Sequence, residues 1–340
     1  MRHTTETPDI TAHAGFSEAP PPGYAARAPT MADAPGAQRV IAACDIANYG
    51  AADTTEAEVR DGWRRIELEH DARVLIDGEG RIAGFADYRA GDAAHLDSHV
   101  FTHPEHAGRG IGTWLTRWAE ARGRELVHRA PAGSRVTIGH VAPTVNEPAL
   151  ALLANEGYAP LRDFLRMAIE MDAPPPEPSW PDGLRARTFV AGADDYAVYR
   201  AIEEAFADHW NRTPRSYEDW RADSLEGESV DTTHWFLAID GDEIAGVSLC
   251  REESGQGFIN TLGVRRPWRR TGAGLALLRH SFGEFYRRGS REVALGVDAQ
   301  SLTGATRLYE RGGMREVRRY RLYTKELRAG KETGRQTLDE

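Results

Sequence analysis

Apolar and polar positions alternate along this chain with two periods, which follow one another in the same order twice. Period-two alternation in short segments, separated by turns such as Asp77-Gly78-Glu79-Gly80, predicts antiparallel strands. Apolar residues three and four positions apart predict amphipathic helices. The first half is expected to contain strands at 24–28, 73–77, 84–89, 95–102, 135–141 and 163–171, and helices at 37–49, 54–68, 111–126 and 147–155.

The second half repeats this order. Strands are expected at 184–189, 235–239, 244–250, 258–264, 292–297 and 315–324, and helices at 194–206, 217–223, 274–286 and 304–310. Gly110 and Gly272 take equivalent places in the two halves and lie 162 positions apart. A repeat of this length indicates two related domains, because solenoid repeats are far shorter.

A proline-rich segment divides the two halves. Residues 173–183 read Ala-Pro-Pro-Pro-Glu-Pro-Ser-Trp-Pro-Asp-Gly, and this proline density excludes regular hydrogen-bonded structure. We therefore expect a domain at 24–172, a linker at 173–183 and a second domain at 184–328. The polar, proline-rich residues 1–23 predict a disordered leader, and the polar residues 329–340 predict a frayed tail.

Composition narrows the class of protein. The formal net charge of −10 argues against nucleic-acid binding, which needs an excess of lysine and arginine. The charge is compatible with capture of a cationic substrate, and equally with solubility alone. No window approaches the ~18 unbroken apolar residues of a membrane span, and residues 1–22 lack the apolar segment of a secretory signal, so a cytoplasmic protein is expected. Cys44 and Cys250 are too few for a disulfide framework and are expected to fill the core.

Each half carries a glycine-rich turn between a predicted strand and a long predicted helix. In the second half the turn reads Arg269-Arg270-Thr271-Gly272-Ala273-Gly274, and in the first half Gly108-Arg109-Gly110-Ile111-Gly112. Glycines let backbone N–H groups approach an anion closely, and the following helix directs the positive end of its dipole to the same point. Both turns are therefore candidate phosphate sites. Nearby arginines are candidate phosphate partners, and the alternative is a solvated basic rim.

The ordered set of motifs resembles the GNAT acetyltransferase superfamily. The second half shows Thr261-Leu262-Gly263-Val264, then the Arg269–Gly274 turn, then a short helix with Leu308-Tyr309 that ends in Gly312-Gly313. The first half is similar but degenerate, because Ala107 replaces the usual Arg or Gln and Leu153 stands where the second half has Tyr309. Over residues 25 to 328 the chain resembles the tandem-domain group that includes mycothiol synthase.

The resemblance implies fold, cofactor and site. It implies an α/β (α+β) fold of two tandem domains, each with a mixed, mostly antiparallel central sheet flanked by helices. Acetyl-CoA would be the co-substrate, with the thioester and pantetheine held by backbone groups of Leu262, Gly263 and Val264 where two parallel strands separate. Tyr309 would be the general acid for the leaving thiolate, and its alternative role is packing on the sheet. The family's strand glutamate falls near Phe258, where no carboxylate exists.

The general base and acceptor site have several candidates. Asp208 and His209 follow the first helix of the second half, where the family's acceptor loop lies, and Trp210, Tyr217 and Trp220 are candidate walls of an acceptor pocket. Asp208 and His209 also fit ordinary structural roles. Glu252, Glu253 and an ordered water chain are rival bases. Four histidines in the first half, His95, His99, His103 and His106, are a weak metal candidate, and no metal is expected.

The expected activity is transfer of an acetyl group to a primary amine of a small cationic acceptor. An amino sugar, an aminoglycoside-like antibiotic or a mycothiol-precursor-like compound fits this expectation. The alternatives are a protein or peptide N-acetyltransferase and a non-catalytic acyl-CoA-binding protein. A monomer or a homodimer is expected.

Overall fold

The computed structural model describes residues 19–333 except 53, 91–92, 211, 213, 227–229, 254 and 302–303. The chain divides into two compact units. Unit 1 contains the residues up to Leu161 together with 321–332, and unit 2 runs from Arg162 to Tyr320. This division differs from the predicted domains at 24–172 and 184–328, because each unit takes part of a strand that the sequence pattern assigned to the other half.

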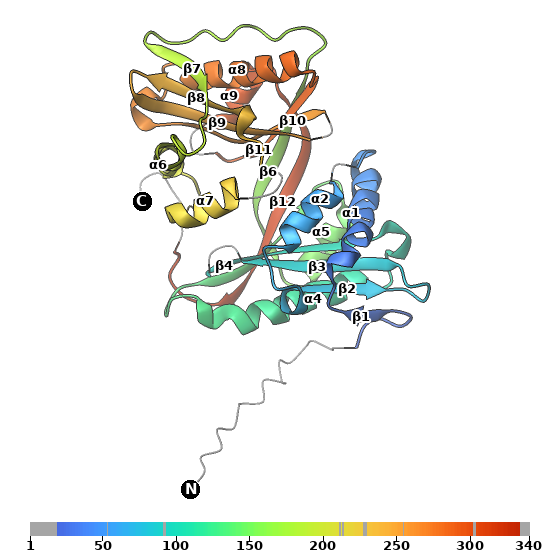
Figure 1. Ribbon diagram of the computed structural model, residues 1–340. Helices are drawn as coiled ribbons and strands as arrows, with labels where there is room; N and C mark the ends of the chain where they lie inside the picture. The colour runs from blue at the N-terminus through green and yellow to red at the C-terminus, as the bar shows by residue number, and fades with distance from the viewer. Residues whose placement is uncertain are drawn as a thin grey trace. The chain divides into compact units, whose positions relative to one another are not determined.

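Unit 1 is a sheet with helices on both faces. Its strands lie in the order β1-β2-β3-β4-β5-β12, and β4 and β5 form its parallel pair. In Figure 1, α1 and α2 lie on one side of β2, β3 and β4, and α4 lies on the other side. The elements are β1 (Ala25–Arg27), α1 (Ala34–Tyr49), α2 (Glu56–Trp63), α3 (Leu68–Asp71), β2 (Ala72–Ile76), β3 (Ile82–Ala90), β4 (His95–Thr102), α4 (Ile111–Leu126), β5 (Val136–Pro143) and α5 (Glu147–Asn155).

The second half of β12 (Arg315–Arg328) completes unit 1. Lys325 Nζ donates to Glu120 Oε2 of α4 at 2.6 Å, and the buried Tyr323 belongs to the same core as α4. Glu332 pairs with His95 and Arg135, so the start of the predicted tail is held in place. The expectation of a frayed tail is therefore wrong for residues 329–332, and residues 334–340 lie outside the described part of the chain.

Unit 2 repeats the architecture. Its strands run in the order β12-β6-β11-β10-β9-β8-β7, where β12 contributes its first half, and β10 pairs with β11 in parallel. Helices α6 and α7 pack on one face, and α8 and α9 pack on the other. The elements are β6 (Ala159–Glu170), β7 (Leu184–Thr188), α6 (Asp195–Phe206), α7 (Tyr217–Leu225), β8 (Trp235–Asp240), β9 (Glu243–Glu253), β10 (Gln256–Val264), α8 (Ala273–Arg288), β11 (Glu292–Asp298) and α9 (Ala305–Arg311).

The turn that precedes β1 in unit 1 is repeated before β7 in unit 2. Tyr24 N donates to Pro21 O at 3.1 Å, and Leu184 N donates to Pro181 O at 3.0 Å. The glycines inside these turns have φ values of +87° at Gly23 and +85° at Gly183, which residues with a side chain rarely adopt. The predicted disordered leader is therefore wrong for residues 21–23, and its residues 1–18 lie outside the described chain.

No helix in the described ranges is both long and apolar enough to cross a lipid bilayer.

Candidate active site

The glycine turn of unit 2 joins β10 to α8. Gly272 is the N-cap of α8 with φ +104°, and Arg270 has φ +65°, the only positive φ of a non-glycine residue in the described ranges. Thr271 Oγ1 donates to Trp268 O at 2.7 Å and fixes the turn. The space in front of the turn is open, because a Cβ at position 272 would meet only the ring of Pro181, at 4.0 Å.

The start of α8 faces this open space. The helix begins at Ala273 and has 16 residues, so the first-turn N–H groups and the positive end of its dipole point at the turn. Gly274 allows α9 to pack closely, since a Cβ there would lie 3.3 Å from Leu308. The turn therefore has the backbone features of a phosphate site, and the exposed Arg270 stands beside it.

Arg269 points into the protein instead of toward the turn. Its guanidinium donates to Val264 O at 3.2 Å, to Ala205 O at 2.9 Å and to Asp208 Oδ2 at 2.7 Å. These three bonds fasten the turn to α6 and to the end of β10. Arg269 therefore shapes the candidate phosphate site through its side chain, and it offers a phosphate only its backbone.

Asp208 accepts hydrogen bonds from two arginines. Arg266 Nη2 donates to Asp208 Oδ1 at 2.6 Å, and Arg269 holds the other oxygen. The hydrogen bonds from Arg266 and then Arg269 lower the pKa of Asp208 to about 2. A carboxylate with this pKa is a poor proton acceptor near neutral pH, because its conjugate acid is far too strong. The geometry thus gives Asp208 a positioning role and argues against its use as the general base.

Two parallel strands of unit 2 separate beside the turn. β10 pairs with β11 from Gln256 to Ile259 only, although β10 continues to Val264. The register between β10 and β9 also shifts between Ile259 and Thr261. Leu262, Gly263 and Val264 lie in the stretch beyond the pairing with β11, as the resemblance implies. Gly263 is required by packing, because a Cβ there would lie 2.8 Å from the Phe206 ring.

Tyr309 lies on α9 in the core of unit 2. Its side chain is 7% exposed and belongs to the same apolar cluster as Leu165, Met167 and Phe282. Burial raises the pKa of Tyr309 to about 12. The phenol is therefore protonated throughout the neutral range and retains a proton to donate.

His209 and Trp210 lie just after α6. His209 packs on Phe206 with ring centroids 4.5 Å apart, and burial lowers its pKa, so the imidazole is neutral at physiological pH. The Arg162 guanidinium lies 4.6 Å from the centroid of the Trp210 ring and also pairs with Asp298. A neutral imidazole has a lone pair that can accept a proton.

Tyr217 and Trp220 belong to a different group of side chains. Trp220 is 4% exposed and stacks on Tyr217 with centroids 6.1 Å apart. Tyr199 and Trp235 lie against the same ring, inside the core between the sheet and α6 and α7. Trp220 is thus a core residue, and the structure does not bring it together with Trp210 as one pocket wall.

The glycine turn of unit 1 keeps the same backbone shape. Gly108 and Gly110 have φ values of +73° and +81°, and Gly110 is the N-cap of the 16-residue helix α4. Ile111 is buried under the sheet, and a Cβ at Gly112 would lie 3.0 Å from Leu152. Arg109 Nη1 donates to Tyr24 Oη at 3.3 Å. The turn retains the frame of a phosphate site, while Leu153 provides no hydroxyl on α5.

The four histidines between positions 95 and 106 have separate partners. His95 Nε2 lies 3.1 Å from Glu332, His106 Nδ1 lies 2.8 Å from Tyr24 Oη, and His103 accepts from Glu105 N. Within the described ranges no group of three or more His, Cys, Asp or Glu residues could hold a metal ion. His99 is different, since its Nδ1 lies 2.9 Å from Asp87 on the neighbouring strand. Sequence reasoning missed Asp87, whose signal was a polar residue facing a histidine across two mostly apolar strands.

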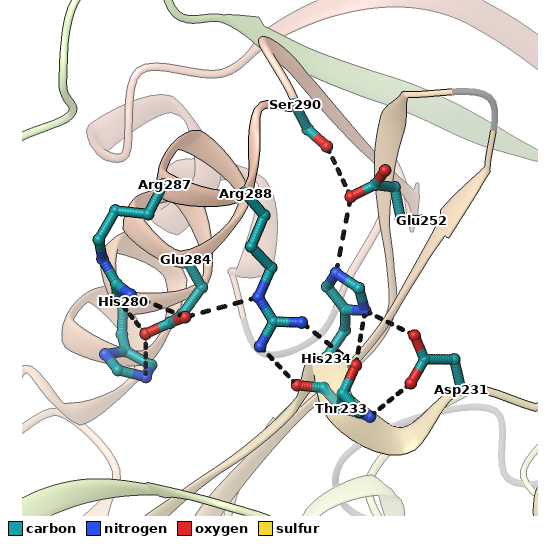
Figure 2. Close-up of polar contacts among 9 residues, drawn as sticks. All are labelled: Asp231, Thr233, His234, Glu252, His280, Glu284, Arg287, Arg288 and Ser290. Carbon is teal, nitrogen blue, oxygen red and sulfur yellow. Dashed lines mark hydrogen bonds and ion pairs between the residues drawn. The ribbon is translucent and has the colours of Figure 1, made fainter.

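A cluster of polar side chains lies at the C-terminal end of α8, as Figure 2 shows. His234, in a short 3-10 helix (Thr232–His234), lies 3.4 Å from Asp231 and 3.6 Å from Glu252. Ser290 Oγ donates to Glu252 at 2.9 Å. The cluster is separated from Gly272 by the whole of α8, roughly 24 Å at 1.5 Å per residue. Glu252, which the sequence offers as an alternative general base, therefore contacts His234 and Ser290 near the C-terminal end of α8. The Glu253 side chain lies outside the described parts of the chain.

The sequence matches known acetyltransferases in both units. The Acetyltransferase (GNAT) family matches residues 33–158 and 196–314. A Mycothiol acetyltransferase of Geodermatophilus obscurus is 30% identical over 281 residues, covering 76% of this chain and 87% of the relative. One from Thermomonospora curvata is 34% identical over 244 residues, covering 70% and 77%.

Solved structures agree with this match. A GCN5-related N-acetyltransferase from Sphaerobacter thermophilus has a TM-score of 0.82 and 43% identity, with 92% of this chain and 98% of that chain covered. A tandem GNAT protein from the clavulanic acid biosynthesis pathway has a TM-score of 0.67 at 17% identity, covering 90% and 99%, and shares the fold. Two matching segments, two glycine turns and two separated strand pairs lead to one conclusion: the chain belongs to the GNAT acetyltransferase family, as an acetyl-transferring enzyme with two GNAT domains in tandem.

Proposed function

We propose that unit 2 transfers the acetyl group of acetyl-CoA to a primary amine of a small acceptor. One observation carries this proposal: the open turn at Gly272, the end of β10 beyond its pairing with β11 and the buried Tyr309 all belong to unit 2. The turn would hold the diphosphate through backbone N–H groups. Backbone groups of Leu262 to Val264 that point away from β9 would hold the pantetheine and polarise the thioester carbonyl, except the Val264 carbonyl, which accepts from Arg269.

Tyr309 would supply the proton that the reaction needs at the sulfur. When a neutral amine attacks the thioester carbon, the carbon–sulfur bond breaks and a thiolate leaves. Its conjugate acid is a stronger acid than a phenol in water, so complete transfer from a free phenol is uphill, and a hydrogen bond from Tyr309 that strengthens as charge develops is the expected form of help. His209 is the proposed acceptor of the proton that the amine must lose, because its lowered pKa keeps it neutral.

The proposed acceptor is a small cationic amine. The relatives are named Mycothiol acetyltransferase, which supports a mycothiol-precursor-like compound. The net charge of −10 supports the wider class of amino sugars and aminoglycoside-like compounds. Peptide amines are the alternative acceptors, and a protein that binds acyl-CoA without turnover is the alternative function.

The test is a panel of amines incubated with acetyl-CoA while free thiol is measured. We expect small cationic amines to release thiol and peptides to release none above background. Tyr309→Phe should lower kcat about 100-fold or more, in the range of general acid catalysis. Tyr196→Phe, which removes the hydroxyl of a tyrosine that is 56% exposed, is the matched control and should leave kcat unchanged.

Two results would contradict parts of the proposal. Thiol release with peptides alone would replace the small acceptor by a polypeptide. An unchanged kcat in Tyr309→Phe would remove the tyrosine from the chemistry and leave it a packing residue.

A further inference from the structure

Unit 1 contains a buried aspartate paired with a partly exposed histidine. Asp87 on β3 and His99 on β4 are directly opposite one another in the antiparallel register, and His99 Nδ1 lies 2.9 Å from Asp87 Oδ1. Asp87 is 3% exposed. Trp63 Nε1, from α2, donates to its other oxygen at 3.3 Å, and Arg89 Nε lies 3.6 Å from Oδ1. The carboxylate is thus fixed from three sides.

This arrangement fixes the protonation pattern of the histidine. Burial raises the pKa of Asp87, but the hydrogen bond from His99 and the positive charges of His99 and Arg89 outweigh it and hold the pKa below the ordinary value. An ionised Asp87 accepts a hydrogen bond, so the Nδ1 of His99 carries a proton. The lone pair of the neutral ring then resides on Nε2. No residue of the described ranges hydrogen-bonds that nitrogen, and the side chain is 33% exposed.

His99 stands where the parallel strands of unit 1 separate. β4 pairs with β5 from His95 to Ser98, and His99 is the first residue beyond this pairing. It lies on the face of the sheet that packs on α2, since Trp63 reaches the same aspartate. The glycine turn with Gly108 and Gly110 follows in the chain. His99 is therefore the residue of β4 at which the pairing with β5 ends, and its side chain is partly exposed there.

Other buried histidines show what a purely structural role looks like. His140 is 3% exposed, and its two ring nitrogens lie 3.2 Å from Ser98 O and 3.2 Å from Tyr158 Oη. His234, in Figure 2, is buried against Phe285 at the end of α8. His99 differs from both, because one nitrogen is oriented by a fixed anion and the other is accessible.

We propose that unit 1 is a second acyl-transfer centre, with His99 as its general base and Asp87 as the residue that positions His99. His99 Nε2 takes a proton from the acceptor's ammonium group, and the neutral nitrogen attacks the carbonyl carbon of an acyl-CoA thioester. A carbon–nitrogen bond forms, the carbon–sulfur bond breaks, and the electron pair leaves with the sulfur. The amide nitrogen then loses its remaining extra proton to water, and the thiolate is the leaving group.

The groups facing His99 set the conditions for this step. Asp87 is the negative group, and Arg89 and, when protonated, His140 are the positive ones. Burial lowers the pKa of His140 to about 4, so that ring is uncharged near neutral pH and adds no repulsion. Leu153 of unit 1 has no hydroxyl group at the position where unit 2 has Tyr309. The thiolate of unit 1 would therefore leave without a hydrogen bond from a tyrosine.

The first test uses the full chain carrying Tyr309→Phe, in which the proposed chemistry of unit 2 is weakened. We expect residual acetyl transfer that falls at least about 100-fold further when His99→Gln is added, as removal of a general base does. His95→Gln, on the same strand but within the stretch paired with β5, is the matched control and should change the rate less than twofold. No residual transfer in the Tyr309→Phe protein, or an unchanged rate in His99→Gln, overturns the proposal.

The second test does not depend on turnover. Calorimetry with coenzyme A should give two molecules per chain, one of which is lost in Gly110→Val and the other in Gly272→Val. Nitrogen-15 NMR of the labelled chain should show the His99 ring with its proton on Nδ1, and Asp87→Asn should shift this pattern while circular dichroism stays native. One coenzyme A per chain, lost only in Gly272→Val, would overturn the second centre and leave the proposed function of unit 2 intact.

Discussion

A histidine paired with an aspartate stands at position 99 of unit 1, where unit 2 has Thr261 facing Leu249. Conversely, unit 2 has the buried Tyr309 where unit 1 has Leu153. One unit therefore has a histidine–aspartate pair without the tyrosine, and the other has the tyrosine without a titratable side chain at the equivalent strand position. A shared backbone frame can therefore carry different titratable groups in its two copies.

The shared frame extends to small details. Arg27 makes two hydrogen bonds to Asp33 in unit 1, and Arg187 makes two to Asp194 in unit 2. Each arginine lies in a short strand, β1 or β7, and each aspartate lies just before the helix that follows, α1 or α6. Charged pairs of this kind fix the path from strand to helix.

The largest expected effect comes from the cores beneath the two turns. Leu115 of α4 and Leu277 of α8 are both fully buried and lie at equivalent positions. Replacing either by alanine should cost about 2–5 kcal/mol, because a cavity remains where the side chain was. Denaturant unfolding followed by hydrogen exchange should show Leu115→Ala acting on amides of unit 1 and Leu277→Ala on those of unit 2. Equal loss of protection in both units from either change would show that they unfold as one body.

A valine at the turn of unit 2 should weaken coenzyme A binding. Gly272→Val forces a branched side chain to adopt φ +104° at the anion site, and we expect about 100-fold lower affinity from strain and obstruction together. Gly289→Val is the matched control, since its φ is +105° at the other end of α8 with no atom within 4 Å of the added Cβ. Affinity measured by calorimetry should stay unchanged there. Equal losses in both variants would assign the effect to strain in α8 alone.

Removing the charge of Asp208 should loosen the turn of unit 2. Asp208→Asn weakens the bonds from Arg266 and Arg269, and we expect a loss of about 1–3 kcal/mol in the free energy of unfolding. Coenzyme A affinity should fall less than in Gly272→Val. If the acetyl-transfer rate fell while the free energy of unfolding and the coenzyme A affinity stayed at wild-type values, Asp208 would have a direct role in the reaction.

The smallest expected effect is a loss of stability in acid. Asp33 of unit 1 and Asp208 of unit 2 each have a folded pKa of about 2, against an ordinary value of 3.8. Their stabilisation is therefore present above about pH 4 and is lost as the pH falls through about 2. Denaturant unfolding between pH 5 and pH 2.5 should show a shallower decline in Asp33→Asn and in Asp208→Asn than in the wild type. Identical slopes in all three proteins would contradict both assignments.

The periodicity of the chain predicted most elements well. The helices α4 and α5 have the bounds expected from sequence, because each begins at a strong signal: a glycine turn before Ile111 and Asn146-Glu147-Pro148 before α5. The strands of both units were also expected near their observed positions. Period-two alternation is a property of the strand's own sequence, so it can be recognised without knowing which sheet the strand joins.

Pairing between distant segments could not be predicted in this way. β6 and β12 are continuous strands that cross the unit boundaries at Leu161 and Tyr320, so no turn or break marks where one unit ends. Asp208 resembled a base in the sequence because its arginine partners lie about sixty residues later in the chain. The same limit hid the pairing of Asp87 with His99, which depends on the register between two strands.

Hydrogen exchange followed by mass spectrometry, with and without coenzyme A, tests the central claim most directly. Binding at the turn of unit 2 should slow exchange of the backbone amides from Arg270 to Ala276, and Gly272→Val should abolish that protection. Protection confined to other segments, with amides 270–276 exchanging at the same rate in both samples, would contradict the account.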